Sequence, residues 1–228
     1  MIKIEKVSKK YGELEIFDEL SLTIPENEVT VILGPSGVGK TTLLNMISKL
    51  DENFTGEIIR NYNKLSYVFQ EDRLLKWKTV EANIRFVLNN ENKSIKSILE
   101  LLELYDLRYK KVKELSGGQM QRVSIARAFA YSSEFIIMDE PFKSLDIFLK
   151  IKIIRDFIKL MENQKRTILL VTHDIREALL LGDNIYIMSA NNKHSFKKIR
   201  IEIAKKGRQL DDDEMMKYEK EIYKKLKI

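Results

Sequence analysis

Two glycine-containing stretches of the sequence could each bind a phosphate group. They are GPSGVGKTT at residues 34–42 and LSGGQ at residues 115–119, and an apolar-patterned run follows each of them. Glycine lets the backbone turn so that several N–H groups point toward one anion, and a helix that begins there adds the positive end of its dipole. The sequence therefore predicts two anion sites within one chain of 228 residues.

The first stretch matches the phosphate-loop pattern G-x-x-x-x-G-K-[ST]. It lies between a predicted buried strand at residues 29–33 and a predicted helix from residue 40, which is the context that the pattern requires. In such a loop Lys40 reaches the β- and γ-phosphates of a nucleotide, and the hydroxyl of Thr41 ligates Mg²⁺. An ordinary glycine-rich turn is disfavoured, because Lys-Thr follows in place. The expected nucleotide-binding residues are Gly34, Pro35, Ser36, Gly37, Val38, Gly39, Lys40, Thr41 and Thr42.

A pair of acids ends the buried run FIIMDE. Asp139 is expected near the metal ion on Thr41 or near its bound water. Glu140 can face the γ-phosphate and orient or deprotonate the attacking water. Paired acids at a strand end can also be a helix cap and a surface charge, but their combination with a phosphate loop favours the catalytic interpretation.

Two further polar residues follow predicted strands. His173 comes directly after the run TILLVT and could donate a hydrogen bond to a γ-phosphate oxygen, which would let it sense that phosphate. Gln70 ends SYVFQ, and its amide could touch Mg²⁺ or the attacking water. Each has a simpler alternative, since a histidine at a strand–helix junction is often only a cap and a glutamine at a strand end often faces solvent.

Apolar patterns predict the elements that position these residues. Strands are expected at 2–7, 14–24, 29–33, 56–60, 64–70, 134–140, 167–172 and 184–189. Helices are expected at 40–50, 117–132, 145–161 and 174–181, with two more inside 79–103. After Ser189 we expect a strand and a peripheral terminal helix that aspartates cap. The first two strands should pair antiparallel, and the alternating buried strands and helices predict an α/β core with a parallel sheet.

Composition narrows the class of protein. A chain of 228 residues with 44% hydrophobic content can form one large domain, and the lack of cysteine excludes disulfides and thiolate metal sites and fits a reducing compartment. The net charge of +6 is interpreted as a solvated lysine surface rather than a nucleic-acid footprint, because no basic stripe is interleaved with aromatics. No segment has the apolar core of a signal peptide or the about 18 apolar residues of a membrane span, so we expect neither.

In order along residues 1–190, these motifs resemble the ATP-binding subunits of ABC transporters. LSGGQ matches the signature of that family, Gln70 its Q-loop, FIIMDE its Walker B strand, SLD at residues 144–146 its D-loop and His173 its switch histidine. Tyr11 stands where the family has an aromatic residue that stacks on adenine, although a tyrosine before a glycine can serve packing alone.

The resemblance implies a fold and an activity. It implies one ABC-type domain over residues 1–228, with a P-loop NTPase core and a mainly parallel sheet. An N-terminal antiparallel β subdomain, an inserted α-helical signature subdomain at about 71–131 and a peripheral C-terminal extension at about 191–228 complete it. The activity is ATP hydrolysis. The catalytic residues would be Glu140, His173, Lys40 and Gln70, and the Mg²⁺ ligands would be Thr41, Gln70 and Asp139.

The family pairs two such domains head to tail, which explains why one chain has two anion sites. The signature of one domain closes over the γ-phosphate of ATP that the other domain holds. The residues that would act across this interface are Ser116, Gly117, Gly118, Gln119 and Asp146. The implied partners are a second copy or a paired ATPase subunit, an integral-membrane permease and an extracytoplasmic solute-binding protein. The chain would sit peripherally on the cytoplasmic face of the membrane and bind no nucleic acid.

A narrower likeness lies in VFQEDRLLKWKTVEANI, residues 68–84. It is similar to the importer branch that serves nitrate, sulfonate, taurine and pyrimidine precursors of thiamine, although Lys76 stands where that branch usually has proline. Leu74, Leu75 and Trp77 would contact a permease helix, or the two leucines would fill the core of their own subdomain.

Two other classes of function stay open at this point. One is an ABC ATPase of an exporter or a cell-division complex, which neighbouring genes for a solute-binding protein would separate from an importer. The other is a non-transport ABC ATPase, for which we would expect two cassettes or a long insertion, and neither is found in the sequence. A binding module without catalysis would lack Glu140 or Lys40, and both are present.

Overall fold

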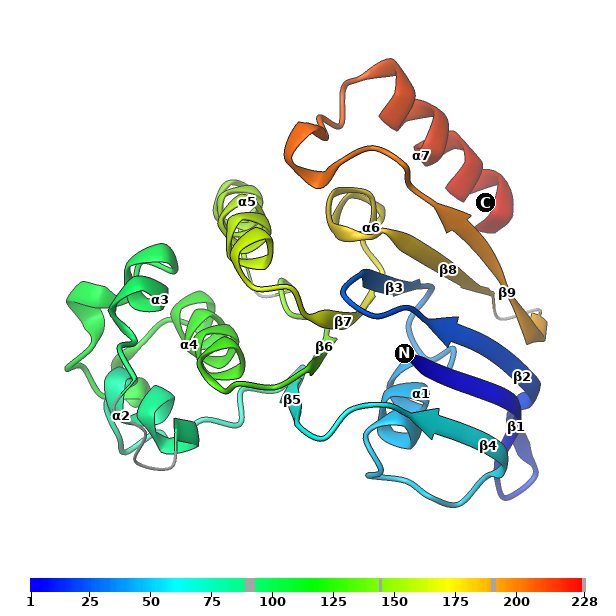
Figure 1. Ribbon diagram of the computed structural model, residues 1–228, viewed down its shortest axis with the longest axis horizontal. Helices are drawn as coiled ribbons and strands as arrows, with labels where there is room; N and C mark the ends of the chain where they lie inside the picture. The colour runs from blue at the N-terminus through cyan, green and yellow to red at the C-terminus, as the bar shows by residue number, and fades with distance from the viewer. Residues whose placement is uncertain (89–92, 144, 190–191, 227–228) are drawn as a thin grey trace.

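The computed structural model describes residues 1–88, 93–143, 145–189 and 192–226. Figure 1 shows the strands gathered on one side of the molecule, helices α2 to α4 on the other, and the C-terminal helix α7 at the top. Two sheets lie within the described ranges. The chain is therefore an α/β protein, as the pattern of its sequence predicts.

The small sheet is antiparallel, with strand order β2-β1-β4. Its strands are β1 (Ile2–Tyr11), β2 (Leu14–Ile24) and β4 (Thr55–Arg60). Strands β1 and β2 form a hairpin in which Tyr11 pairs with Leu14. The antiparallel pairing predicted for the first two strands is confirmed, and β1 extends further than predicted, so that Tyr11 ends a strand.

The main sheet positions the candidate chemistry. Its strand order is β5-β6-β7-β3-β8-β9, and the first five strands run parallel while β9 is antiparallel to β8. Its strands are β3 (Val29–Leu33), β5 (Leu65–Val68), β6 (Phe135–Asp139), β7 (Thr167–Thr172), β8 (Asn184–Ser189) and β9 (Asn192–Arg200). Leu33 pairs with Thr172 and Asp139 pairs with Val171, so the carboxyl ends of β3, β6 and β7 lie side by side. The residues that follow these strands therefore meet at one edge.

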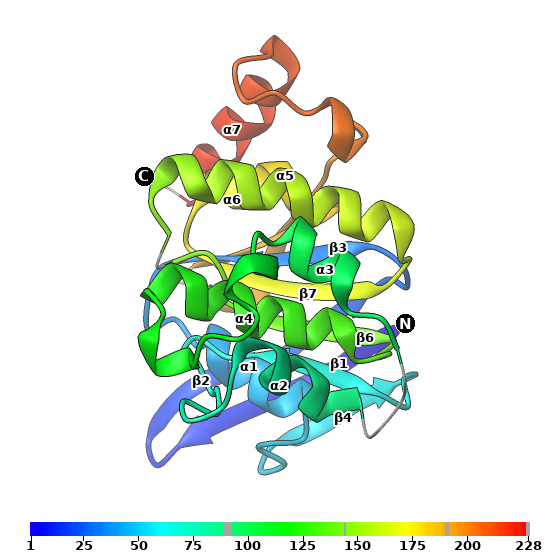
Figure 2. The ribbon, with the colours of Figure 1, turned by 90° about the vertical axis from the view of Figure 1, so that its left-hand side faces the viewer.

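Helices cover both faces of the main sheet, as Figure 2 shows from the side. The helices are α1 (Lys40–Ile47), α2 (Val80–Arg85), α3 (Lys96–Leu101), α4 (Gly117–Ala130), α5 (Ile147–Asn163), α6 (Ile175–Leu181) and α7 (Asp213–Leu226). Strand β6 shows why its run is apolar throughout. Ile136 and Met138 belong to the core cluster with Phe157 of α5, whereas Ile137 belongs to the cluster with Leu43 of α1.

Helix α1 ends three residues earlier than its apolar spacing predicts. Lys49 adopts a left-handed backbone with φ 63°, and the backbone N–H groups of Leu50 and Lys49 donate to the carbonyls of Asn45 and Met46. This pair of hydrogen bonds is the Schellman arrangement that closes a helix, normally with glycine at the left-handed position. Leu50 lies beyond it and is 59% exposed, so the prediction that Leu50 continues the apolar face is wrong.

The segment after Ser189 forms the predicted strand and helix. Strand β9 completes the main sheet, and Met215 and Ile222 of α7 are fully buried in the same core cluster as β8. The Arg208 guanidinium donates to the carbonyls of Leu179 and Gly182 at the end of α6. The segment is thus packed onto the core at three points. Within the described part of the chain, no helix combines the length and the apolar composition needed to cross a bilayer.

Candidate functional site

The loop at residues 34–42 joins β3 to α1 and depends on glycine at two positions. Gly37 and Gly39 have φ 78° and φ 107°, a region that residues with a side chain rarely adopt. A Cβ atom on Gly39 would also lie 2.7 Å from Cγ2 of Ile16 in strand β2. Both the conformation and the close approach of the small sheet therefore require glycine where α1 begins.

Lys40, the first residue of α1, points back into this loop. Its ammonium donates to the carbonyl oxygens of Gly34 at 2.8 Å and Pro35 at 2.7 Å. The residue is only 5% exposed, and burial lowers the pKa of the Lys40 ammonium, while the nearby carboxylates of Glu140 and Asp139 oppose that shift. Among the described residues the ammonium's hydrogen bonds go to loop carbonyls, so this buried cation is positioned to receive an anion in the loop.

Thr41 and Asp139 lie side by side across the edge of the sheet. The Thr41 hydroxyl donates to Oδ2 of Asp139 at 2.9 Å, which joins α1 to the end of β6. Burial raises the pKa of the Asp139 carboxyl, against the effect of that hydrogen bond. A hydroxyl and a carboxylate are hard oxygen ligands of the kind that Mg²⁺ prefers. In the ranges that the structure describes, no cluster of three or more His, Cys, Asp or Glu side chains could hold a metal ion.

Glu140 is held in a strained backbone conformation with φ 48°. Three groups contact its carboxylate. His173 Nδ1 lies 3.2 Å from Oε1, Lys143 Nζ lies 3.1 Å from Oε2, and Gln70 Nε2 lies 3.5 Å from Oε2. Burial alone would raise the pKa of the Glu140 carboxyl, but the contacts with Lys143 and His173 outweigh it and lower the pKa. The carboxylate is therefore ionised at neutral pH.

These residues line one cleft of about 450 Å³ at the carboxyl edge of the main sheet. Its lining residues are Tyr11, Ile16, Ser36, Gly37, Gly39, Lys40, Thr41, Thr42, Gln70, Asp139, Glu140 and Lys143. The structure thus brings the phosphate loop, both acids and Gln70 together, and His173 reaches the cleft through Glu140. The sequence analysis missed Ile16 and Lys143. The spacing of Lys143, three residues after Glu140 in a turn, is a signal that could have identified it.

Tyr11 forms the outer wall of the cleft, where its residue is 49% exposed. Its hydroxyl donates to Oδ2 of Asp51 at 2.8 Å, and the Lys9 ammonium lies 4.5 Å from its ring centroid. Lys9 is buried and forms an ion pair with Asp51 at 2.7 Å. This arrangement fixes the ring at the cleft while part of it stays open to solvent. It is therefore compatible both with stacking on adenine and with a role in packing alone.

The second glycine stretch lies apart from the cleft. Ser116 caps α4, because its hydroxyl accepts from the backbone N–H of Gln119 at 3.3 Å, and the Gln119 side chain accepts from the Ser116 N–H at 3.0 Å. A Cβ atom on Gly117 would have no atom within 4 Å. None of residues 115–119 lines the cleft. Among the described residues, the side-chain hydrogen bonds at this helix end come from its own Ser116 and Gln119 and not from another element.

A partly buried ion-pair network lies behind His173. Lys150 of α5 is 2.7 Å from Oε1 of Glu177 and 3.0 Å from Oδ2 of Asp174, both on the loop and helix that follow His173. Thr172 donates to Oε2 of Glu177 at 2.6 Å. Asp146 caps α5 by accepting from the N–H of Leu149, and Ser144 lies outside the described residues. The network therefore ties the start of α5 to the histidine loop.

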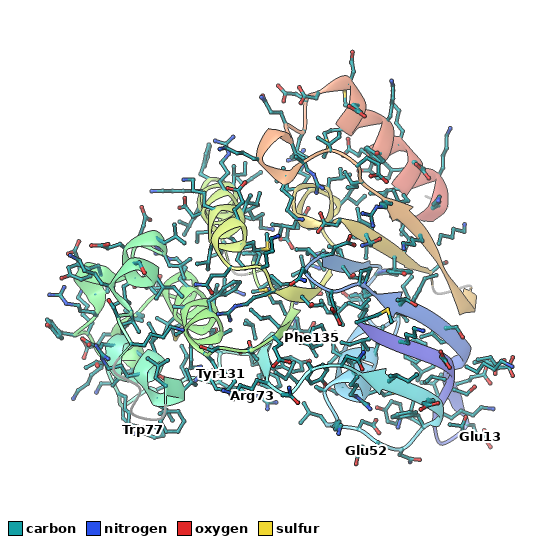
Figure 3. All side chains as sticks on the ribbon, in the orientation of Figure 1. Glu13, Glu52, Arg73, Trp77, Tyr131 and Phe135 are labelled. Atoms are coloured by element: carbon teal, nitrogen blue, oxygen red, sulfur yellow. The ribbon has the colours of Figure 1, made fainter. Side chains whose placement is uncertain are left out.

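The residues predicted to contact a permease separate into two groups. Leu74 is 8% exposed and packs in the core, so the packing alternative is correct for it, and Leu75 is half-buried. Trp77 is 69% exposed, and Figure 3 shows it at the outer edge of the helical part, far from both sheets. Only Trp77 is thus fully available to another molecule.

Comparison with known proteins supports the family resemblance that the sequence motifs indicate. The model of the family "ABC transporter" matches residues 17–143. The aliphatic sulfonates import ATP-binding protein SsuB of Bacillus cereus is 37% identical over 196 residues, which cover 80% of this chain and 77% of that protein. The formylaminopyrimidine import ATP-binding protein ThiZ of Halalkalibacterium halodurans is 35% identical over 210 residues, covering 88% and 84%.

The fold has close counterparts among solved structures. The dimeric structure of MJ0796, a bacterial ABC transporter cassette, superposes with a TM-score of 0.77 at 30% identity and covers 90% of this chain and 100% of its own. A post-hydrolysis state of the same cassette bound to ADP and Pi gives a TM-score of 0.76 over the same coverage. The mostly parallel main sheet, the small antiparallel sheet and the helical part are therefore those of an ABC ATPase cassette, and that prediction is confirmed.

Proposed function

We propose that this chain, which belongs to the ABC transporter family, is the ATP-hydrolysing subunit of an importer for a small solute. Membership of the family means that the chain binds and hydrolyses ATP. The observation that carries the rest of the proposal is the meeting of Lys40, Thr41, Asp139 and Glu140 in one cleft. A single domain with a helical subdomain at about residues 71–131 would present that cleft to a second copy.

The cleft supports a specific arrangement of the nucleotide. The backbone N–H groups of the loop after Pro35 and of the start of α1 surround the β- and γ-phosphates, and the Lys40 ammonium exchanges its loop carbonyls for phosphate oxygens. The Tyr11 ring stacks on the adenine. The exposed face of that ring and its fixed position support this role.

Mg²⁺ fits the oxygen donors at this edge. Thr41, Asp139 and the Gln70 amide would hold it, with phosphate oxygens and water in the remaining positions, because the protein alone offers too few ligands. When bound, the ion neutralises charge on the β- and γ-phosphate oxygens.

Hydrolysis follows from the position of Glu140. Its carboxylate accepts a proton from a water molecule as the water oxygen bonds to the γ-phosphorus, and the bond between that phosphorus and the β,γ-bridging oxygen breaks to release ADP. His173 Nδ1, now 3.2 Å from Glu140, is close enough to the same space to donate to a γ-phosphate oxygen. The left-handed backbone of Glu140 fixes the direction of the carboxylate.

The second copy completes the site. We propose that Ser116, Gly117, Gly118 and Gln119 of one chain, at the open end of α4, cover the γ-phosphate that the other chain holds, with Asp146 beside the interface. Each chain would then give its phosphate loop to one site and its signature to the other.

The relatives support the cellular role. SsuB, ThiZ and the taurine import ATP-binding protein TauB of Roseobacter denitrificans, 33% identical over 219 residues, are all named for import. We propose that this chain drives uptake of a small sulfonate, taurine-like, nitrate-like or thiamine-precursor solute through a permease, to which a solute-binding protein delivers it. The chain would lie on the cytoplasmic face of the membrane, with Trp77 against the permease.

The substitution Glu140→Gln tests the proposal. The variant is expected to bind ATP with wild-type affinity, to lose hydrolysis at least about a hundredfold, and to accumulate as an ATP-bound dimer. Turnover of radiolabelled ATP and the molar mass from light scattering with and without ATP are the measurements. Glu100→Gln, at an exposed position of α3, is the control. Wild-type turnover by Glu140→Gln would rule out Glu140 as the general base.

A further inference from the structure

Lys143 is built into the turn that carries Glu140. The backbone N–H of Lys143 donates to the carbonyl of Glu140 at 3.2 Å, which closes the turn and places the two side chains on the same side. Lys143 Nζ then lies 3.1 Å from Oε2 of Glu140. The Lys143 side chain is 50% exposed, whereas that of Glu140 is 8% exposed. The carboxylate is therefore the fixed partner, and the lysine reaches it from solvent.

This ion pair occupies an atom that hydrolysis needs. His173 already lies on Oε1 of Glu140, and Gln70 and Lys143 both lie on Oε2. The contact of the Lys143 ammonium with Oε2 is charge-assisted, so it is stronger than that of the neutral Gln70 amide with the same oxygen. A carboxylate that takes a proton from water needs one oxygen free for that water. Both oxygens of the Glu140 carboxylate thus already have partners in this structure.

The charges of the cleft show what would remove Lys143 from Glu140. Lys40 and Lys143 balance Asp139 and Glu140, so the resting cleft is close to neutral, while a nucleoside triphosphate brings several negative charges. Lys143 also lines a second, smaller pocket with His173 and Lys150. It therefore stands between the phosphate loop and the histidine, the direction in which the proposed nucleotide would extend its terminal phosphate.

We propose that Lys143 is a second phosphate-binding lysine, which pairs with Glu140 in the absence of nucleotide and moves to the terminal phosphate when ATP binds. The move frees Oε2 of Glu140 for the attacking water. ADP lacks the terminal phosphate, so the Lys143–Glu140 pair re-forms once phosphate leaves. Lys143 thereby makes the cleft prefer ATP over ADP. This inference rests on the ATPase role proposed above.

The test compares Lys143→Met and Lys143→Arg with Lys159→Met. Lys159 is an exposed lysine paired with Asp156 three residues before it, at 3.0 Å on α5, so its loss removes the same kind of pair away from the cleft. Dissociation constants are measured by calorimetry for ADP and for the non-hydrolysable triphosphate AMP-PNP, each with Mg²⁺, and KM for ATP is measured beside them. Thermal melting checks that each variant is folded.

Lys143→Met is expected to bind AMP-PNP about tenfold more weakly, to bind ADP within about twofold of wild type, and to raise KM for ATP by a similar factor of about ten. Lys143→Arg should restore the preference for the triphosphate, and Lys159→Met should match wild type. Equal losses for both nucleotides, or no loss for AMP-PNP, would overturn the role of Lys143 while leaving the ATPase intact. A wild-type chain that failed to hydrolyse ATP would overturn both proposals.

Discussion

The two glycine stretches differ in how much of their own chain surrounds them. The loop at residues 34–42 is enclosed by side chains from β2, β6 and the turn after β6, and its lysine is buried. The stretch at 115–119 is anchored in the core by Leu115 and capped by Ser116 and Gln119, and it stands open at Gly117. The first region is thus preorganised to bind a ligand alone, whereas the second, in the function proposed above, would act on a ligand that another chain holds.

The largest effect is expected for Lys40→Met, which should disrupt ATP binding by the enclosed loop at residues 34–42. The substitution removes a buried charge that faces the loop, so ATP affinity should fall about a hundredfold or more, and hydrolysis should fall with it. Binding of a fluorescent ATP analogue measures the affinity. A variant that bound ATP as wild type does would show that the loop does not receive the phosphates.

Ser116→Arg should break the open region while sparing the enclosed one. The bulky cation at the cap of α4 is expected to block approach of a second chain, so hydrolysis should fall about a hundredfold. The affinity of the monomer for ATP should stay within about twofold of wild type, because no residue of the stretch lines the cleft. A collapse of monomer affinity instead would contradict the division between the two regions.

Lys150→Met tests whether the network behind His173 supports the enclosed region. It leaves Glu177, whose side chain is 3% exposed, without its cation, and should lower the free energy of unfolding by about 2 kcal/mol. The double variant Lys150→Met with Glu177→Gln should recover part of that loss. Urea denaturation of the three proteins measures it, and equal stabilities would show that the pair contributes nothing.

The smallest effect is expected at the outer wall of the cleft. The hydrogen bond from Lys9 lowers the pKa of the Asp51 carboxyl, with further help from Tyr11. A carboxyl with a lowered folded-state pKa adds stability above its unfolded pKa of about 3.9 and loses it as the pH falls through the folded value. Asp51→Asn should therefore be less stable than wild type at pH 6, and the difference should shrink as the pH falls below about 3.9, as thermal melting across that range would measure. A difference that did not change with pH would contradict this account.

The sequence predicts the buried strands and the helix cap well, because both depend on residues that are close together in the chain. The apolar runs at 29–33, 135–139 and 167–172 are buried on both faces, and such runs are typical of parallel strands. The residues after them then had to share one edge, which is why the phosphate loop and the acids could be expected together. The capping of α4 by Ser116 follows from the same local chemistry.

The features that could not be predicted from the sequence depend on backbone conformation at single residues and on contacts between residues far apart in the chain. Lys49 closes α1 in a conformation that usually takes glycine, so nothing in the residue types marked the helix end. The contact of Lys143 with Glu140 depends on a particular turn, and the pair of Lys9 with Asp51 joins residues 42 positions apart. Leu74 was ambiguous, because an apolar residue looks the same whether it fills a core or waits for a partner.

The capping box of α4 also uses part of the anion-binding capacity of this helix end. The N–H of Ser116 is taken by the Gln119 side chain, and the N–H of Gln119 by the Ser116 hydroxyl, so half of the first four donors around this helix end already have acceptors. Chloride or free phosphate that used all four donors would have to displace both side chains. In the proposed pair of chains, a phosphate held by the second chain would arrive with the binding free energy of the whole docked surface, so it would compete for these donors better than a free anion.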